Sequence, residues 1–261
     1  MQSREVYAPG GRERVPVPPS KHRPQLHLRC DHTCGVTTAN RAYCWGNNHS
    51  GQLGDGTGTT RLTPVAVAGG LEFRHVSAGQ GHTCGLTRDD RAYCWGENNL
   101  GQLGDGTTTR RHRPVAVAGG LSFRQVSVGF LHSCGIDAVN HKALCWGSNE
   151  YGRLGDGSTL KQRLKPVPVT GGRSFSQLSA GWDHTCAVTP GARVFCWGNG
   201  SNGQIGDGKT YQRWTPRAVT GGLSFTRVSA GVFHTCGETT NNLPYCPAAW
   251  HTAGAAQEPI A

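Results

Sequence analysis

Long apolar stretches are missing from the sequence, which has a single methionine and fewer acidic than basic residues, 16 against 26. A helix that crosses a membrane needs about 18 or more consecutive apolar residues, and no such stretch occurs, so we expect no membrane span. The N-terminus also lacks the apolar core of a signal peptide. Because no extended apolar stripe with a helical period is present, the sequence does not predict a helical fold.

Sequence signatures of common catalytic sites are missing as well. The chain has no glycine-rich phosphate loop of the nucleotide-binding kinds, no His-Glu-x-x-His segment and no single Ser/His/Asp set. We therefore expect a protein that is not an enzyme and that needs no cofactor.

Glycine and cysteine are plentiful instead, with 39 and 11 residues, and they mark a repeat of about 50 residues. Each repeat has a His-Thr/Ser-Cys triplet, then a Cys-Trp-Gly triplet, then a turn of the form Gly-x-x-Gly-Asp-Gly. The first triplet begins at His32, His82, His132, His184 and His234. In the fifth copy Cys246 is followed by Pro247, so this copy lacks the tryptophan.

Short runs between turn residues indicate strands within each repeat. The runs "FRHVSAG", "HTCGLT", "RAYCWG" and "PVAV" predict four antiparallel strands per unit, and such a unit is typical of a β-propeller blade. We predict an all-β propeller over residues 26–248, with four full four-stranded blades, a partial fifth and an incomplete ring. Residues 1–25 and 249–261 show no strand pattern, and we expect them to be irregular tails. A β-solenoid is the alternative, although its turns are normally shorter.

The cysteines occupy matching positions of a hairpin. In "HTCGLTRDDRAYCWG" a turn centred on Asp89 places Cys84 opposite Cys94 and Gly85 opposite Tyr93, and side chains that face each other across two strands lie near disulfide distance. Five pairs of this kind indicate an oxidising compartment. The predicted pairs are Cys34–Cys44, Cys84–Cys94, Cys134–Cys145, Cys186–Cys196 and Cys236–Cys246, with Cys30 left as a free thiol.

Two other interpretations of the cysteines stay open. They can serve as small buried apolar side chains, or they can join the histidine of the same repeat in a zinc site, which lacks a fourth ligand. The repeated histidine itself is interpreted as structural, because a catalytic residue breaks the symmetry of a repeated scaffold and His82 has an equivalent in every copy. Asp105 lies in a turn where aspartate caps the local backbone, and a calcium loop needs more oxygen ligands. We expect no metal site.

The segment "HTCGLTRDDRAYCWGENNLGQLGDGTTTRRHRPVAV" resembles the repeat of the regulator of chromosome condensation family. The resemblance covers about 220 residues and implies a propeller, which has seven blades in well-known members. Members of the family include a guanine-nucleotide exchange factor for a nuclear Ras-like GTPase, which also binds chromatin, and exported bacterial proteins to which this cysteine-rich form is similar. The exchange factor uses a loop inserted into one blade, and the repeat steps of 50 to 52 residues leave no room for one.

Seven blades would need about 350 residues, whereas this chain has 261. We therefore expect a fragment or a frame-shifted piece of a longer protein, whose missing part would carry a signal peptide. An extracellular or periplasmic location is favoured if the cysteines are paired, with the cytoplasm or the nucleus as the alternative.

The formal net charge is +10, and part of it follows the Gly-Asp-Gly turns. Because these loops recur at one place in each blade, we expect a basic rim that would attract nucleic acid or an acidic protein. The residues are Arg110, Arg111, Arg113, Lys161, Arg163 and Lys165. A solvated loop that keeps the protein soluble is the favoured alternative, so nucleic acid is not the favoured partner.

Positions that differ between copies are the candidates for binding. The two residues after the glycine of each "VSAG"-type run vary most, and they are expected near the mouth of the central channel. The candidates are Gln80, Phe130, Leu131, Trp182, Asp183, Val232 and Phe233. A second variable pair, Glu150-Tyr151 in the third copy, extends this surface.

Large apolar side chains at a rim are typical interface anchors, although packing between blades explains them equally well. We predict a non-enzymatic interaction scaffold that binds a protein partner through this rim. Guanine-nucleotide exchange with chromatin association is the alternative.

Overall fold

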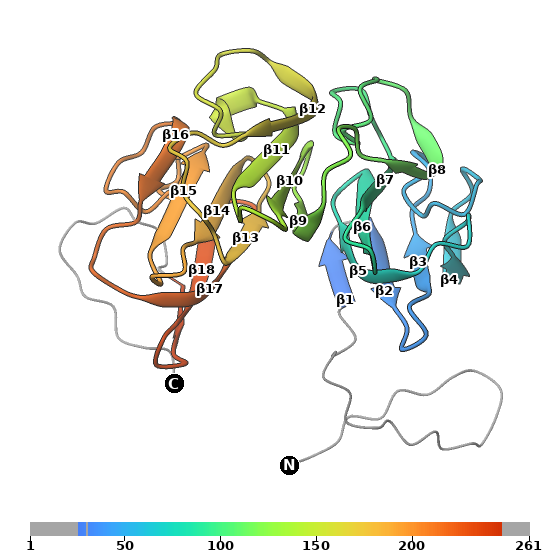
Figure 1. Ribbon diagram of the computed structural model, residues 1–261, viewed down its shortest axis with the longest axis horizontal. Coiled ribbons are helices and arrows are strands. Elements are labelled where there is room, and N and C mark those ends of the chain that lie inside the picture. Colours follow the sequence, from blue (N-terminus) through green and yellow to red (C-terminus); the bar gives the residue numbers. More distant parts are fainter. Residues whose placement is uncertain (1–25, 30, 247–261) are drawn as a thin grey trace.

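Five antiparallel sheets follow one another in chain order in the computed structural model, which describes residues 26–29 and 31–246 (Figure 1). The first four sheets have four strands and the fifth has three, and strands that are consecutive in the chain are neighbours in each sheet. Each sheet is therefore a meander, as in a propeller blade. The all-β prediction is confirmed, and the sheets are termed blades one to five.

The strands match the runs predicted from the repeats, except that the fourth strand of each four-stranded blade begins three or four residues before the predicted "PVAV"-type run. Blade one contains β1 (Leu26–Arg29), β2 (His32–Val36), β3 (Ala42–Gly46) and β4 (Arg61–Ala66). Blade two contains β5 (Phe73–Ala78), β6 (His82–Thr87), β7 (Ala92–Gly96) and β8 (Arg111–Ala116). Blade three contains β9 (Phe123–Val128), β10 (His132–Asp137), β11 (Ala143–Ser148) and β12 (Gln162–Pro168). Blade four contains β13 (Gln177–Ala180), β14 (His184–Val188), β15 (Val194–Gly198) and β16 (Arg213–Ala218).

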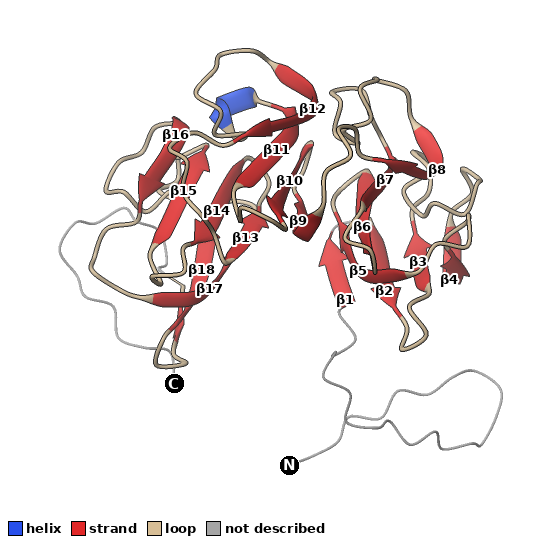
Figure 2. Cartoon of the chain, in the orientation of Figure 1, coloured by secondary structure: helices blue, strands red, loops and turns tan. Residues whose placement is uncertain are grey.

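Blade five contains β17 (Phe225–Ala230), β18 (Thr235–Thr239) and β19 (Pro244–Tyr245). One 3₁₀ helix, η1 (Glu150–Gly152), follows β11 and is the single helical element of the described residues (Figure 2). Residues 26–29 and 31–246 thus contain no helix with the length and hydropathy of a membrane span.

The first strand of each blade lies on the inner side of the arc, and the fourth strand lies on the outer side (Figure 1). Inner strands touch, which explains their small residues: a Cβ atom on Gly79 would lie 2.5 Å from the carbonyl oxygen of Gly129 in the next blade. Ser77 Oγ also accepts a hydrogen bond from the backbone N–H of Val128, at 3.1 Å. The inner strands are therefore joined by backbone contacts that only small side chains allow.

The hairpin register is as predicted. Cys84 faces Cys94 and Gly85 faces Tyr93 across β6 and β7, and all five predicted disulfides are present. The disulfide interpretation of these cysteines is confirmed, whereas Cys30 lies outside the described residues.

The hydrophobic core is divided into clusters that lie between neighbouring blades. Trp95 of blade two is fully buried, and its Nε1–H donates a hydrogen bond to the carbonyl oxygen of Gln52 in blade one, at 2.9 Å. The indole ring lies 5.6 Å from the ring of Phe73. Trp146 and Trp197 are equally buried in the next two interfaces, although their indole N–H groups make no such hydrogen bond, so each tryptophan packs its blade against the preceding one.

The repeated histidine forms a second inter-blade contact. His82 Nε2 lies 2.9 Å from Ser133 Oγ of the next blade, and His32 Nε2 lies 2.7 Å from Thr83 Oγ1. Burial lowers the pKa of His82 to about 3 and that of His32 to about 4, so both rings are neutral at pH 7. These contacts favour the structural interpretation.

Candidate functional site

The variable residues predicted near the channel mouth lie on loops that the backbone holds in a row. The N–H of Phe130 donates a hydrogen bond to the carbonyl oxygen of Gly181 in the next blade, at 3.2 Å, and the N–H of Trp182 donates to Gly231 at 3.0 Å. The loops of blades three, four and five are thus joined in sequence. We term this row the axial arc, defined as Gln80, Phe130, Leu131, Trp182, Asp183, Val232 and Phe233.

An aromatic pair lies at the centre of the axial arc. The rings of Phe130 and Trp182 are stacked, with centroids 4.3 Å apart and planes 18° apart, although the residues come from different blades. Both side chains are only half-buried, and Phe233 in the next blade is 61% exposed. The sequence left open whether these residues bind a partner or pack between blades. The structure shows inter-blade stacking that leaves part of each ring in contact with solvent.

The strongest departure from repeat symmetry is an arginine beside the aromatic pair. Arg153 occupies the position that is glutamine in the other turns, and its side chain is 1% exposed. Its Nη1 lies 2.9 Å from Asp183 Oδ1, and its Nη2 lies 3.3 Å from Glu150 Oε2. The guanidinium also lies over the ring of Tyr151, 5.8 Å from its centroid. The two variable pairs noted in the sequence, Trp182-Asp183 and Glu150-Tyr151, are therefore brought together by a residue that sequence reasoning missed.

Burial dominates the electrostatics of this cluster. It lowers the pKa of the Arg153 guanidinium, while Asp183 and Glu150 act in the opposite direction. Burial likewise raises the pKa of the Asp183 carboxyl, although Arg153 opposes this shift. Each charge thus depends on the other for its stability, because a buried ion is favourable only when it is paired. The replacement of glutamine by arginine in "GRLGDG" was the available sequence signal.

The positive charge of the basic rim is partly neutralised by the aspartates of the Gly-Asp-Gly turns. Arg111 lies 3.0 Å from Asp105 and Arg163 lies 2.7 Å from Asp156, and each aspartate side chain is 5% exposed or less. Arg110 is exposed and donates a hydrogen bond to the carbonyl oxygen of His49 in blade one. The remaining residues of the rim, all exposed, are Arg113, Lys161 and Lys165.

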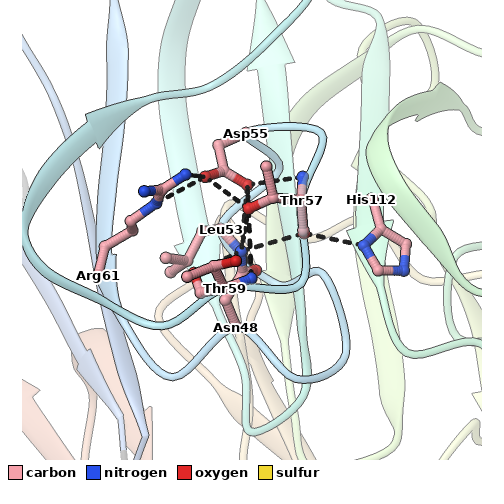
Figure 3. A network of polar contacts seen from close by, with 7 residues as sticks. All are labelled: Asn48, Leu53, Asp55, Thr57, Thr59, Arg61 and His112. Carbon is pink, nitrogen blue, oxygen red and sulfur yellow. Dashed lines mark hydrogen bonds and ion pairs between the residues drawn. The ribbon is translucent and has the colours of Figure 1, made fainter.

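Figure 3 shows the Gly-Asp-Gly turn of blade one, which is equivalent to the turns that contain Asp105 and Asp156. Asp55 Oδ2 accepts a hydrogen bond from Arg61 Nε at 3.0 Å, and Asp55 Oδ1 accepts one from Asn48 Nδ2 at 3.1 Å. Burial acts to raise the pKa of Asp55, but hydrogen bonds from Thr57 and Arg61 outweigh it and hold the pKa below its usual value. His112 of blade two closes the network, with Nδ1 at 2.8 Å from the carbonyl oxygen of Thr57. The turn aspartate therefore orders the loop, as the sequence predicted.

No group of three or more His, Cys, Asp or Glu side chains is placed to hold a metal ion in the part of the chain that the structure describes. The charged side chains described above form ion pairs with one another, as Arg153 does with Asp183 and Arg111 with Asp105. The chemistry open to the axial arc is thus recognition by apolar contact, stacking and ion pairing.

Solved structures with similar folds identify the architecture. Human WBSCR16 superposes with a TM-score of 0.75 at 22% identity, over 84% of this chain and 58% of that one. The yeast regulator of chromosome condensation, Prp20, solved with Kap60 bound, gives a TM-score of 0.72 at 20% identity, over 85% of this chain and 54% of that one. The predicted propeller fold is confirmed, and the chain spans little more than half of each of these relatives.

Curated relatives match over a shorter stretch. The ultraviolet-B receptor UVR8 of Arabidopsis thaliana is 44% identical over 70 residues, which are 26% of this chain and 16% of the receptor. The human regulator of chromosome condensation is 37% identical over 73 residues, which are 28% of this chain and 17% of that protein. Each alignment therefore covers less than a fifth of the relative.

A family model matches nearly the whole repeat region. The model described as the regulator of chromosome condensation (RCC1) repeat covers residues 40–86, 89–136, 140–188 and 192–237. Each match begins in or just after the hairpin turn of one blade and ends within the hairpin of the next blade. One repeat of the model therefore spans an interface between two blades. Because these matches cover well over half of the sequence, the chain belongs to the regulator of chromosome condensation repeat family.

Proposed function

We propose that this chain is a non-enzymatic interaction scaffold that binds a protein partner through the axial arc. The observation that carries the proposal is the stacked pair of Phe130 and Trp182, which come from two blades and are only partly buried. Aromatic side chains with restricted freedom are typical anchors of protein interfaces. Phe233 extends the apolar surface.

The charged cluster next to the rings supports the same proposal. Glu150 has a side chain that is 62% exposed, whereas Asp183 is 19% exposed and Arg153 is buried. An apolar centre bordered by polar groups is the usual composition of a protein interface. The cluster would therefore form part of the rim around an aromatic anchor.

The relatives support binding as a general use of this fold. Prp20 has been solved in a complex with Kap60, and its binding to Gsp1p and histones has been characterised. At 20% identity these complexes support no particular partner for this chain. We further propose that the protein acts in an oxidising compartment, because disulfides persist there and are rare in the cytosol.

The proposal is tested by comparing partner capture by the wild-type protein with capture by Trp182→Ala and Phe130→Ala. Loss of an interface anchor typically weakens binding by about 2 kcal/mol, or roughly thirtyfold. The expected result is that proteins retained by the wild type, identified by mass spectrometry, bind each variant at least tenfold more weakly in calorimetry. Tyr211→Ala is the matched control, because Tyr211 is an aromatic residue 52% exposed and outside the axial arc.

Denaturant unfolding of the same variants separates binding from folding. We expect a loss of about 1 kcal/mol from the broken stack. A loss of about 3–5 kcal/mol, typical of a fully buried aromatic, would assign Phe130 and Trp182 to the core. Equal capture by all variants would move the search for the binding face to Arg110, Arg113 and Lys161 of the basic rim.

A further inference from the structure

The linker between blades three and four departs from the repeat at one position. The four linkers contain "VAGGLE", "VAGGLS", "VTGGRS" and "VTGGLS", so Arg173 stands where the others have leucine. Leu71 and Leu121 pack against the apolar clusters of the first two interfaces. Arginine is therefore the exception at a position that otherwise contributes to packing between blades.

Arg173 packs on an aromatic ring of blade four together with a second arginine. Its guanidinium carbon lies 4.4 Å from the centroid of the Phe195 ring, and that of Arg193 lies 5.7 Å from the same centroid. Phe195 is buried, whereas both arginines are exposed. A guanidinium that stacks on a ring keeps the N–H groups at its edge available as donors. Two sets of donors thus lie beside one ring, within reach of a single ligand.

A third cation comes from blade three. The backbone of Lys142 forms an antiparallel bridge with Ser174, the residue after Arg173. The N–H of Phe175 also donates a hydrogen bond to the carbonyl oxygen of His141, at 2.8 Å. These contacts hold the hairpin of blade three against the linker, so the exposed Lys142 is a neighbour of Arg173.

The equivalent arginine of blade two is neutralised by a carboxylate, but this cluster is not. Arg91 has the repeat position of Arg193 and lies 3.5 Å from Asp89. The hairpin of blade four, residues 189–193, contains no acidic residue. Within residues 26–29 and 31–246, no ion pair includes Arg173, Arg193 or Lys142.

The acidic residue in the hairpin of blade three is engaged by its own turn. Asp137 Oδ1 accepts hydrogen bonds from the backbone N–H groups of Val139 and Asn140, each at 2.9 Å, and Asp137 is buried. Like charges that are held close together repel each other. The three cations therefore favour a negatively charged ligand that binds between them.

We propose that Arg173, Arg193 and Lys142 form a binding site for a phosphate or sulfate group. The planar fork of a guanidinium matches two oxygen atoms of such an anion and can donate two parallel hydrogen bonds to them. Arg193 follows β14, whereas Trp182 and Asp183 of the axial arc precede this strand. The site is thus at the other end of the strand, and the proposal does not depend on the partner-binding function.

Pyrophosphate is the first probe, titrated into the full-length protein by calorimetry at an ionic strength of about 0.1 M. We expect saturable binding with one site per chain. Raising the ionic strength to about 1 M should weaken it roughly tenfold, because the Debye length falls from about 10 Å to about 3 Å. Binding that does not respond to salt would contradict an assignment that rests on charge.

Sucrose octasulfate distinguishes the sources of the anionic group. Tighter binding of this compound indicates sulfate esters on a sugar, whereas tighter binding of pyrophosphate indicates a free phosphate anion. Both results support the site. Failure of both compounds to bind at millimolar concentrations overturns it.

Arg173→Leu tests the location and restores the residue found in the other linkers. It should weaken pyrophosphate binding roughly tenfold and leave the urea midpoint unchanged or higher, because leucine packs at this position in the first two interfaces. Arg91→Gln is the matched control, because it removes the same charge where Asp89 already neutralises it. Equal weakening by the two variants would show that binding follows net charge alone, and would overturn the site.

Two substitutions of the second arginine complete the design. Arg193→Gln should weaken binding roughly tenfold, and Arg193→Lys about threefold, because lysine keeps the charge but not the fork. Unchanged binding by both Arg173→Leu and Arg193→Gln would place the anion elsewhere and overturn the proposal. Trp182→Ala should leave pyrophosphate binding unchanged, so failure of this site and failure of the axial arc are distinguishable.

Discussion

The Gly-Asp-Gly turns and the axial arc follow opposite patterns from blade to blade. In the turns the aspartate–arginine ion pair recurs in blades one to four. In the axial arc the equivalent positions carry one polar, two aromatic and one aliphatic residue, namely Gln80, Phe130, Trp182 and Val232. The repeated contacts thus hold the blades in place, whereas the side chains of the axial arc can differ from one blade to the next.

The largest expected effect is on the repeated side of this comparison and concerns the disulfides. Each joins cysteines 10 or 11 residues apart, and closing a loop of this length stabilises a fold by about 2–3 kcal/mol. Five together are comparable to the whole stability of a typical domain, about 5–15 kcal/mol. We expect reduction with dithiothreitol to unfold the protein, as measured by near-ultraviolet circular dichroism.

A thiol count on the denatured, unreduced protein accompanies this experiment. One free thiol, Cys30, is expected, and eleven would contradict the disulfide pairing. Retention of the native spectrum after complete reduction would show that inter-blade packing is sufficient without the disulfides.

The second prediction compares a repeated tryptophan with a variable one. Trp146→Ala should lower the free energy of unfolding by about 3–5 kcal/mol, because its indole is fully buried between blades two and three. Trp182→Ala should cost about 1 kcal/mol. Urea unfolding of the two variants under identical oxidising conditions gives the difference, and equal losses would remove the distinction between scaffold and axial arc.

The third prediction concerns pH and the buried histidines. Their pKa values in the folded protein, about 3 for His82 and about 4 for His32, lie below the ordinary value of 6.5. Between these limits the unfolded chain binds protons that the folded chain does not, so stability is highest above about pH 6.5 and falls as the pH decreases. From pH 7 to pH 5 each histidine should remove about 2 kcal/mol.

Urea unfolding from pH 8 to pH 5 measures this slope. His82→Gln keeps a hydrogen-bonding group opposite Ser133 and should reduce the slope by the contribution of one proton. A slope that is unchanged in this variant would show that His82 is not the group responsible.

The last prediction concerns the ion pair between Arg153 and Asp183 of the axial arc. Arg153→Gln restores the residue found in the other turns and leaves Asp183 close to solvent, so we expect a loss of about 1 kcal/mol. Asp183→Asn instead leaves the buried guanidinium with Glu150 alone and should cost about 2 kcal/mol or more. A double-mutant cycle by urea unfolding measures the coupling, and additivity of the two losses would show that the ion pair contributes nothing.

Much of the fold could be predicted because the repeat makes it visible. The spacing between Cys84 and Cys94 was sufficient to set the hairpin register, since facing positions follow directly from the turn. The stacking of Phe130 on Trp182 was not predictable, because it depends on the separation between two blades. The same limit applies to Arg153 and Asp183, which are 30 residues apart in the sequence and meet only across an interface.

The basic rim shows where a pattern was overlooked. Arg111 and Arg163 were counted as a surface charge, and both lie against an aspartate of their own turn. The aspartate and the arginine keep a spacing of six or seven residues in each copy, as in Asp55 and Arg61. That regularity indicated an ion pair, but only the fold of the turn shows that the two side chains can meet.

The short span of each disulfide has a consequence for biosynthesis. In the described blades every cysteine bonds with a partner 10 or 11 residues away, within its own hairpin. Under oxidising conditions each disulfide can therefore form as soon as the two strands of its own hairpin are paired, without waiting for the next blade. Formation of the correct pairs thus depends on the turn within each hairpin and not on the order in which the blades assemble.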